Sequence, residues 1–334
     1  MNILFYSPQT LPSVGGLQYV VHYWAEALGK KGNQVTLISE TKGAKEQLCS
    51  YTIYENIPLR QQRTLLATAQ VFLYFDVSLK GLPLWIGSGK PLIFSHQSGL
   101  WYEGKKIPFR QQLKRWVANH LATKNIACSR FIAKSYKRCE VVYNPIRQDL
   151  FAAPEGIKRL PGTILFAGRL VTDKGVDLLM EAFSILQKSL PKRTLKLWIA
   201  GDGPEKEALI RRSVTLGISD QVFFLGMLSQ EDLVGWMHQC SVMVVPSRME
   251  PMGMVAAEGL AAGCTMVLSN NGGLPEVGGP FCHYFQSEDV VSLADALQQA
   301  VEKPLVVDAT ALQQHLSQFT IEHSIRELEE MLKR

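Results

Sequence analysis

Two glutamates, Glu250 and Glu258, stand eight positions apart where the chain passes from a predicted strand into a predicted helix. The apolar run at 242–245 is typical of a buried strand, and the pattern at 254–262 predicts a helix. Pro251 disfavours helical backbone at the residue before it, so we expect Glu250 in the turn and Glu258 inside the helix. The two carboxylates therefore have different surroundings.

The start of this predicted helix is suited to bind an anion. Its first backbone N–H groups, near Gly253, Met254 and Val255, have no acceptor within the helix. Carboxylates beside such an anion do not suit the phosphate itself, but each accepts hydrogen bonds from two hydroxyl groups. Ribose and sugar hydroxyls are donors of this kind, so the segment predicts a nucleotide-sugar site. For the pair alone, two carboxylates on a helix surface are an equally good explanation.

Two cations follow an earlier predicted strand at 163–167. Arg169 lies in the turn after this strand, and Lys174 lies five positions later. A diphosphate requires positive charge of this kind, and arginine binds it through two N–H groups at once. An isolated Arg or Lys is more often a solvated surface charge. Cations and carboxylates at successive strand ends, however, favour a common site.

Glycine-rich turns follow three more predicted strands. Gly201 and Gly203 belong to one turn, and residues 272–276 form another. Such turns let a ligand approach the backbone closely, although each is a weak signal alone. Gly15 and Gly16 stand at the start of a predicted helix, where a donor phosphate or an acceptor could approach them. A plain tight turn explains these two glycines equally well.

Strand and helix patterns alternate along the chain, which is typical of repeated βα units. Such units form parallel sheets with helices on both faces, and ligands bind at the carboxyl ends of the strands. The predicted strands lie at 3–6, 34–39, 91–95, 163–167, 195–200, 222–225, 242–245 and 265–269.

The length of 334 residues suits two domains of about 150 residues each. We predict an α/β fold of two Rossmann-like, doubly wound domains that face each other across a cleft. Their expected bounds are 1–150 and 151–318. A helix within 319–334 follows, with packing on the N-terminal domain as one option.

Composition excludes several classes of protein. With 46% hydrophobic and 19% charged residues, the chain is globular and not disordered. No apolar run reaches the roughly 18 residues of a membrane span, and the N-terminus lacks the basic start of a signal peptide. The six cysteines have no metal-type spacing and are typical of a reduced, cytoplasmic protein. Because Asp-x-Asp is absent from the sequence, we expect no metal and no other cofactor.

Charge is distributed unevenly. Residues 1–150 contain 19 Lys and Arg against 8 Asp and Glu, a net charge of +11, whereas 151–334 contain 16 against 22, a net charge of −6. Within the basic half, 101–124 combines cations with aromatic residues, which suits the surface of an anionic membrane. A solvated helix face is the alternative, and no nucleic-acid fold is recognisable. The residues concerned are Trp101, Tyr102, Lys105, Lys106, Phe109, Arg110, Lys114, Arg115, Trp116 and Lys124, with Glu103 as the one acidic residue.

The order of the motifs resembles the retaining glycosyltransferases of family 4, which have the GT-B fold. The motifs are Gly-Arg-Leu…Lys-Gly at 168–175, Gly-Asp-Gly-Pro at 201–204, Pro-Ser…Glu-Pro-Met-Gly…Glu at 246–258 and Gly-Gly-Leu-Pro-Glu at 272–276. The resemblance is dense over 163–297. It implies transfer of a sugar from a nucleotide-sugar, such as a UDP- or GDP-sugar, with retention of configuration. The N-terminal domain would bind the acceptor, for which we expect a glycan or a lipid-linked molecule of polysaccharide or lipopolysaccharide synthesis.

At matching positions, the resemblance implies that Arg169 and Lys174 bind the donor diphosphate. Glu258 would hold the ribose hydroxyls, and Glu250 the hydroxyls of the transferred sugar. The backbone around Met254 would contact phosphate and sugar. The nucleotide phosphate itself would accept the proton of the acceptor, so that Glu250 positions the sugar and is not the general base.

His96 follows the predicted strand at 91–95 and is a candidate catalytic residue. A lone histidine is usually structural, but the resemblance implies a histidine near the reacting sugar at this point. Ser129 is a weaker candidate at another strand end. The sequence departs from many members of the family at 144–146, where Asn-Pro-Ile replaces Asn-Gly. A role for a flexible glycine there is therefore not expected.

Two other functions are considered. A nucleotide-sugar epimerase of the same architecture would consume donor without an acceptor, and a non-catalytic protein would only bind the nucleotide-sugar. The joint presence of Arg169, Lys174, Glu250 and Glu258 argues against the second. A dehydrogenase is not expected, because Gly-x-Gly-x-x-Gly does not follow the first strand.

Overall fold

The computed structural model describes residues 1–11, 15–40, 50–78, 81–98, 107–154 and 156–333, and it divides into two compact units. Unit 1 comprises Met1–Pro145 and Phe319–Arg334, and unit 2 comprises Ile146–Gln318. The chain thus leaves unit 1 a little before the expected boundary at 150, and it returns to unit 1 for its last helix.

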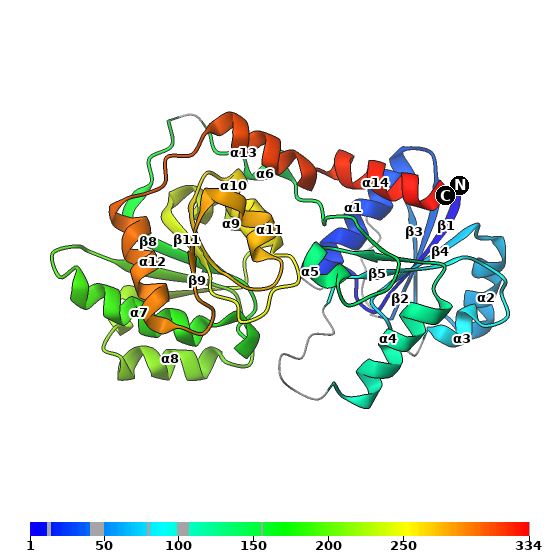
Figure 1. Ribbon diagram of the computed structural model, residues 1–334, viewed down its shortest axis with the longest axis horizontal. Helices are drawn as coiled ribbons and strands as arrows, with labels where there is room; N and C mark the ends of the chain where they lie inside the picture. The colour runs from blue at the N-terminus through cyan, green and yellow to red at the C-terminus, as the bar shows by residue number, and fades with distance from the viewer. Residues whose placement is uncertain (12–14, 41–49, 79–80, 99–106, 155, 334) are drawn as a thin grey trace. The chain divides into compact units, whose positions relative to one another are not determined.

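Unit 1 is built on a parallel sheet with the strand order β3-β2-β1-β4-β5-β6-β7 (Figure 1). Its strands are β1 (Asn2–Ser7), β2 (Gln34–Ser39), β3 (Thr52–Glu55), β4 (Val71–Phe75), β5 (Leu92–His96), β6 (Lys124–Ala127) and β7 (Cys139–Val141). Its helices are α1 (Gly16–Lys30), α2 (Leu59–Thr68), α3 (Leu82–Trp85), α4 (Phe109–Leu121), α5 (Arg130–Ala133) and α14 (Ile321–Lys333). The sheet winds outward from β1 in both directions, so the predicted doubly wound topology is confirmed.

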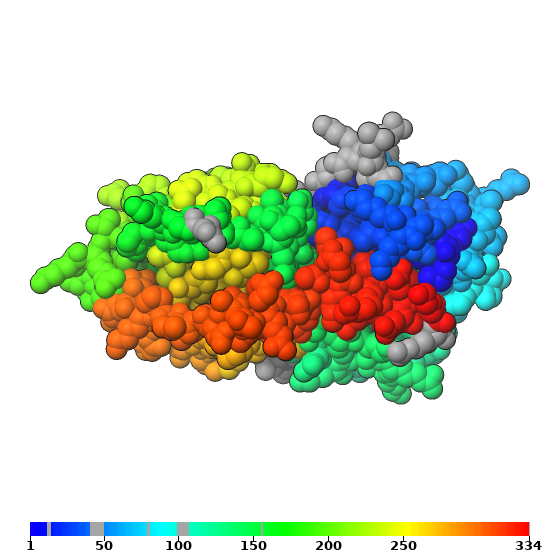
Figure 2. Space-filling model, turned by 90° about the horizontal axis from the view of Figure 1, so that it is seen from above, coloured from blue at the N-terminus to red at the C-terminus, as the bar shows by residue number. Residues whose placement is uncertain are grey.

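The last helix, α14, packs on α1 within unit 1, and Figure 2 shows its red segment beside the blue one. The fully buried Trp24 of α1 donates its indole N–H to the Ser324 hydroxyl at 2.9 Å. That hydroxyl in turn donates to the Tyr143 carbonyl oxygen at 2.8 Å. At the surface, Lys31 and Glu329 form an ion pair at 3.0 Å. The relay therefore gives the buried Trp24 indole an acceptor and links it to the Tyr143 backbone.

Unit 2 contains a second parallel sheet with the order β10-β9-β8-β11-β12-β13. Its strands are β8 (Leu160–Ala167), β9 (Lys196–Ala200), β10 (Val222–Gly226), β11 (Cys240–Val245), β12 (Thr265–Ser269) and β13 (Cys282–Phe285). Its α-helices are α6 (Gln148–Phe151), α7 (Val176–Ser189), α8 (Lys206–Thr215), α9 (Gln230–Gln239), α10 (Met254–Ala261), α11 (Leu274–Gly278), α12 (Val290–Glu302) and α13 (Ala309–Leu316). Single 3-10 turns occur at η1 (Thr172–Lys174), η2 (Ser219–Gln221), η3 (Gly279–Phe281) and η4 (Ser317–Phe319).

The helices of unit 2 cover both faces of its sheet. In Figure 1, α7, α8 and α12 lie on one face, and α9, α10 and α11 lie on the other. The core on the first face is formed by apolar side chains of β8, β9 and β11 packed against α7 and α12, with Phe183 and Leu297 fully buried. Because both faces are covered, β8, β9, β11 and β12 are largely apolar, which is why these strands were recognisable in the sequence.

We predict that Ser324→Ala destabilises unit 1 by about 2 kcal/mol. The substitution leaves the buried Trp24 indole N–H without its acceptor, and it also removes the hydrogen bond from Ser324 to the Tyr143 carbonyl. Lys31→Met is the control. It breaks only the exposed ion pair to Glu329, for which we expect less than about 1 kcal/mol. Urea unfolding followed by tryptophan fluorescence measures both losses. Equal losses in the two variants would contradict the structural role of the relay.

Candidate functional site

The predicted site residues of unit 2 stand on the loops that follow β8, β9 and β11 or in the helix α10, and the glycine-rich turn at 272–276 follows β12. β8 and β11 pair in the middle of the sheet, and the chain winds outward from this pair in opposite directions. In parallel sheets of this kind, ligands bind where the two directions part.

The loops after β8 and β9 pack against each other through their backbones. The N–H groups of Gly168 and Leu170 donate to carbonyls at the end of β9 and in the loop after it, each at 2.9 Å. A Cβ atom on Gly201 would lie 1.8 Å from the Gly168 carbonyl oxygen, and one on Gly203 would lie 2.4 Å from that of Leu170. The close approach of the two loops therefore explains both glycines. Their contact with a ligand stays a prediction.

Lys174 and Glu250 meet although they lie on different loops. The Lys174 ammonium nitrogen is 2.5 Å from Oε2 of Glu250, and the Ser247 hydroxyl donates to the same oxygen at 3.2 Å. The Glu250 main chain is fixed as well, because its carbonyl accepts the Gly273 N–H at 2.8 Å. Among the described residues, none donates to Oε1 of this largely buried carboxylate. One oxygen of Glu250 is thus held in place, and the other remains able to accept hydrogen bonds from a ligand.

Glu258 lies within α10 and is 7% exposed. No hydrogen bond reaches its side chain from the part of the chain that the structure describes, and burial raises the pKa of its carboxyl to about 7. Gly253 precedes the helix with a left-handed φ of 96°, and a Cβ there would lie 2.5 Å from the Leu274 side chain. Among the residues that the structure describes, no side chain caps α10, so the N–H groups at Met254 and Val255 stay available to an anion.

Arg169 is exposed and has neither an ion pair nor a side-chain hydrogen bond within the described ranges. It follows β8, five positions before Lys174, as predicted. Within its described residues, unit 2 therefore brings to one edge of its sheet a cation without an ion pair, a paired cation, two buried carboxylates and a helix start without a side-chain cap. The remaining candidates, His96, Gly15 and Gly16, belong to unit 1.

His96 ends β5 and is buried. Its Nε2 lies 2.8 Å from Oδ1 of Asn125, and its ring stacks on Tyr136 with the centroids 3.5 Å apart. The Asn125 amide nitrogen donates to the carbonyls of Ala118 and Lys137. The amide oxygen therefore faces the imidazole, and Nε2 must carry the hydrogen. Burial lowers the pKa of His96 to about 4, so the ring is neutral near pH 7 and Nδ1 is an acceptor.

The other unit 1 candidates have local structural roles. Gly15 is the N-cap of α1, and Gly16 is its first residue. The Ser129 hydroxyl accepts the Ile132 N–H at 3.2 Å and so caps α5. This cap accounts for a polar residue that is completely buried.

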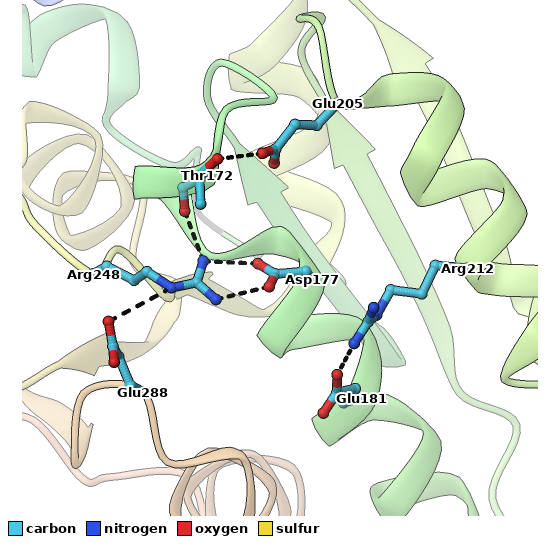
Figure 3. A network of polar contacts seen from close by, with 7 residues as sticks. All are labelled: Thr172, Asp177, Glu181, Glu205, Arg212, Arg248 and Glu288. Carbon is cyan, nitrogen blue, oxygen red and sulfur yellow. Dashed lines mark hydrogen bonds and ion pairs between the residues drawn. The ribbon is translucent and has the colours of Figure 1, made fainter.

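The sequence interpretation gave no role to Ser247 or Arg248, although both lie inside the motif at 246–258. The Ser247 hydroxyl holds Glu250, and the Arg248 guanidinium lies among polar groups of several loops (Figure 3). The signal that could have found them is their place between the strand and Glu250. In a strand-to-helix turn, the polar residues next to a buried carboxylate tend to hold it.

Of the basic segment at 101–124, residues 101–106 lie outside the described residues, and most of the rest belongs to α4, with Lys124 at the start of β6. Phe109 is 78% exposed and Trp116 is 52% exposed, and Trp116 stacks on His120 at 5.0 Å. Arg110 and Arg115 are exposed on the same helix. Large aromatic side chains and cations thus share the solvent-facing side of α4.

Within the described residues, no three His, Cys, Asp or Glu side chains gather as metal ligands would. The described helices likewise include none with the length and apolar character needed to cross a membrane.

Several known proteins are similar to this chain in sequence or in fold. A glycogen synthase of Mycobacterium tuberculosis is 34% identical over 153 residues, which are 45% of this chain and 36% of the relative. The chain thus spans about a third of the length of that relative. The structure of HepE from Anabaena in complex with UDP and glucose has a TM-score of 0.83 at 18% identity, covering 100% of this chain and 99% of HepE. The structure of WaaG, a glycosyltransferase involved in lipopolysaccharide biosynthesis, has a TM-score of 0.72 at 15% identity, covering 97% and 94%.

These two likenesses concern the fold, and they confirm the predicted GT-B architecture of two Rossmann-like domains. The family is shown by a sequence profile, Glycosyl transferases group 1, which matches residues 148–322. This match covers more than half of the chain and includes the four loops described above. The chain belongs to the group 1 glycosyl transferases.

Proposed function

We propose that the protein is a retaining glycosyltransferase that moves a sugar from a UDP- or GDP-sugar to a glycan or a lipid-linked acceptor of envelope polysaccharide or lipopolysaccharide synthesis. The observation that carries the proposal is the set of groups at one edge of the unit 2 sheet. Two buried carboxylates with acceptor capacity to spare stand beside cations and an uncapped helix start. Hydroxyl groups and a diphosphate on one molecule match this set.

The roles follow from the chemistry of each group. Arg169 and Lys174 bind the diphosphate, and the first N–H groups of α10 share its charge. Glu258 accepts hydrogen bonds from the two ribose hydroxyls, and these replace the water that burial has removed. Glu250 offers its free oxygen to hydroxyls of the transferred sugar while Lys174 and Ser247 hold the other oxygen.

The leaving nucleoside diphosphate develops negative charge as the sugar departs. Preorganised cations and backbone dipoles stabilise such charge without rearrangement. The proposal therefore needs no metal ion. The acceptor hydroxyl attacks from the face that the diphosphate leaves, and a phosphate oxygen takes its proton. Glu250 positions the sugar in this scheme, and the neutral His96 of unit 1 offers Nδ1 as an acceptor for a hydroxyl of the reacting sugar.

The UDP and glucose in the HepE structure support a nucleotide-sugar as donor. The basic, aromatic surface of α4 supports an acceptor presented at an anionic membrane, with the protein peripheral on the cytoplasmic side. Cations there would attract the lipid headgroups, and Phe109 and Trp116 would enter the interface.

We predict that UDP, GDP or one of their sugar conjugates raises the melting temperature of the protein by mass action. Lys174→Ala and Glu258→Ala should abolish the shift, because they remove diphosphate and ribose contacts. Lys188→Ala, an exposed residue near the far end of α7, is the control and should keep the shift. Thermal-shift screening measures the effect, and a full shift in both site variants would refute the donor site.

A pH dependence follows from the raised pKa of Glu258, about 7 against an ordinary value of 4.5. The ribose hydroxyls donate to the ionised carboxylate, so affinity for a nucleotide-sugar should increase with pH up to about 7 and then level off. We expect binding to be about tenfold weaker at pH 6 than at pH 8. The phosphodiester groups of a nucleotide-sugar do not titrate in this range, so calorimetry at several pH values isolates the carboxyl.

Glu258→Gln is the control for this dependence and should bind weakly at every pH. Without ligand, the sign is opposite. The unfolded chain releases the proton near pH 4.5 and the folded protein only near pH 7, so the free energy of unfolding falls as pH rises between these values. Glu258→Gln should remove that fall. If Glu258→Gln keeps the pH dependence of binding or of stability, that dependence belongs to another group.

For the membrane surface, we predict that the protein floats with vesicles containing phosphatidylglycerol and not with pure phosphatidylcholine. Reversing two exposed cations of α4, Arg110→Glu with Arg115→Glu, should abolish flotation. Reversing Lys30 and Lys31 at the end of α1 changes the net charge equally and should leave it intact. If the Arg110→Glu, Arg115→Glu variant still floats, the proposal that α4 binds the membrane is wrong.

A further inference from the structure

Arg248 stands two residues before Glu250 and is the centre of the polar contacts in Figure 3. Its Nη1 and Nη2 atoms donate to the two carboxylate oxygens of Asp177 at 2.8 and 2.7 Å. Nη1 also donates to the Thr172 carbonyl at 2.6 Å, and Nε lies 3.7 Å from the Glu288 carboxylate. One guanidinium thus joins the loop after β11 to the loops after β8 and β13.

The backbone of Arg248 adds two further links. Its N–H donates to the Asp173 carbonyl at 2.9 Å, and its carbonyl accepts from the Asn271 side chain at 2.7 Å. Burial opposes ionisation of Asp177, but the hydrogen bonds from Arg248 outweigh it and lower the pKa of that carboxyl. The Arg248–Asp177 pair is therefore ionised near pH 7, partly buried and bidentate, which is the strong form of such a contact.

The contacts of Arg248 bracket Lys174. Thr172 and Asp173 precede the lysine in the turn η1, Asp177 follows it in the first turn of α7, and all three are bonded to Arg248. Glu250, the partner of Lys174, is two residues from Arg248 along the chain. The arginine thus holds the chain on both sides of the Lys174–Glu250 contact, and in the described part of the structure it forms no hydrogen bond or ion pair with either of these side chains.

Arg248 is poorly suited to bind the diphosphate directly. Both terminal nitrogens already donate to Asp177, and one donates to a carbonyl as well. A second carboxylate, Glu288, stands beside Nε. These acceptors neutralise the guanidinium, in contrast to Arg169, which is exposed and has no ion pair within the described ranges.

We infer that Arg248 is a positioning residue for the donor diphosphate, which acts by holding the ammonium group of Lys174 beside Glu250. The inference rests on the proposed function. Its geometric basis is the planar fork of the guanidinium, which bonds a carboxylate and a carbonyl in one plane. A lysine at this position keeps the charge but loses the fork, so Arg248→Lys separates the two contributions.

The same helix α7 supplies a matched control. Glu181 forms an ion pair with Arg212 of α8, and Figure 3 shows this pair apart from the Arg248 contacts. It joins the two helices and makes none of the contacts that bracket Lys174. Arg212→Lys therefore perturbs an Arg–carboxylate pair of α7 without perturbing the site.

A double-mutant cycle tests the inference, with UDP and GDP as separate calorimetric probes. We expect Arg248→Lys and Lys174→Ala each to weaken binding by about tenfold. The double variant should bind no more weakly than Lys174→Ala alone. If Arg248 acts only through Lys174, replacing it has no further effect on affinity once the lysine side chain is gone. Arg212→Lys should bind like the wild type. Losses that multiply in the double variant would overturn the inference and assign Arg248 an independent role.

Hydrogen exchange without ligand provides a readout that does not depend on the donor. Arg248→Lys should speed amide exchange at 172–175 and 247–253, while Arg212→Lys should leave both segments unchanged. Unchanged exchange at 172–175 in Arg248→Lys would overturn the positioning role. If the wild type binds neither UDP nor GDP, the proposed function is wrong, and Arg248 then has no role in binding a donor diphosphate. Exchange then shows whether Arg248 orders the Lys174 segment at all.

Discussion

The site of unit 2 depends on loops that pack backbone against backbone at the carboxyl edge of a parallel sheet. A Cβ on Gly175 would meet the Pro246 carbonyl oxygen at 2.2 Å, and one on Gly272 would meet that of Glu250 at 2.2 Å. Only glycine permits this distance. Because the loops after β8, β11 and β12 touch in this way, side chains from distant parts of the sequence reach the same place.

The same packing of the loops buries the carboxylates of Glu250 and Glu258. Burying an ionised, unpaired carboxylate away from water costs free energy, and the two glutamates of the site differ in how this cost is met. Glu250 is ion-paired and hydrogen-bonded on one oxygen. Glu258 has no such partner among the described residues, and burial shifts its pKa toward neutrality. Folding alone gains little from Glu258, and polar residues that weaken the folded state are characteristic of binding sites.

Much of the fold could be predicted from the sequence, because strands buried on both faces are continuous apolar runs. Each of the eight predicted strands is present. The strands β3, β4, β7 and β13 were missed. Thr52–Glu55, Cys139–Val141 and Cys282–Phe285 are short and partly polar. Val71–Phe75 is apolar throughout, but so short an apolar run does not distinguish a buried strand from a buried helix segment. Positions within the site were partly predictable: Pro251 places Glu250 in a turn and Glu258 in α10. The partner of Lys174 was not, because an ion pair between loops 76 residues apart leaves no local pattern.

Arg248 and His96 are further examples of residues whose contacts could not be predicted from the sequence. The arginine was invisible because its partners, Asp177 and Glu288, are distant in sequence, although its place in the motif was in view. His96 was noticed for its position at a strand end. The bonds of Asn125, which fix its tautomer, come from the neighbouring strand and from two backbone carbonyls. Charge and hydrogen-bond states depend on such contacts, which only the folded chain brings together.

The return of the chain to unit 1 has a consequence for synthesis. Unit 2 is one uninterrupted stretch, whereas unit 1 lacks α14 until residues 321–333, which follow unit 2 in the sequence, have been added. The hydrogen bonds of the Ser324 hydroxyl with the Trp24 indole and the Tyr143 carbonyl therefore cannot form until all of unit 2 has been translated. Because domains generally fold as units as they leave the ribosome, unit 2 can be complete before unit 1 closes. The order of folding is thus the reverse of the order in which the two units begin.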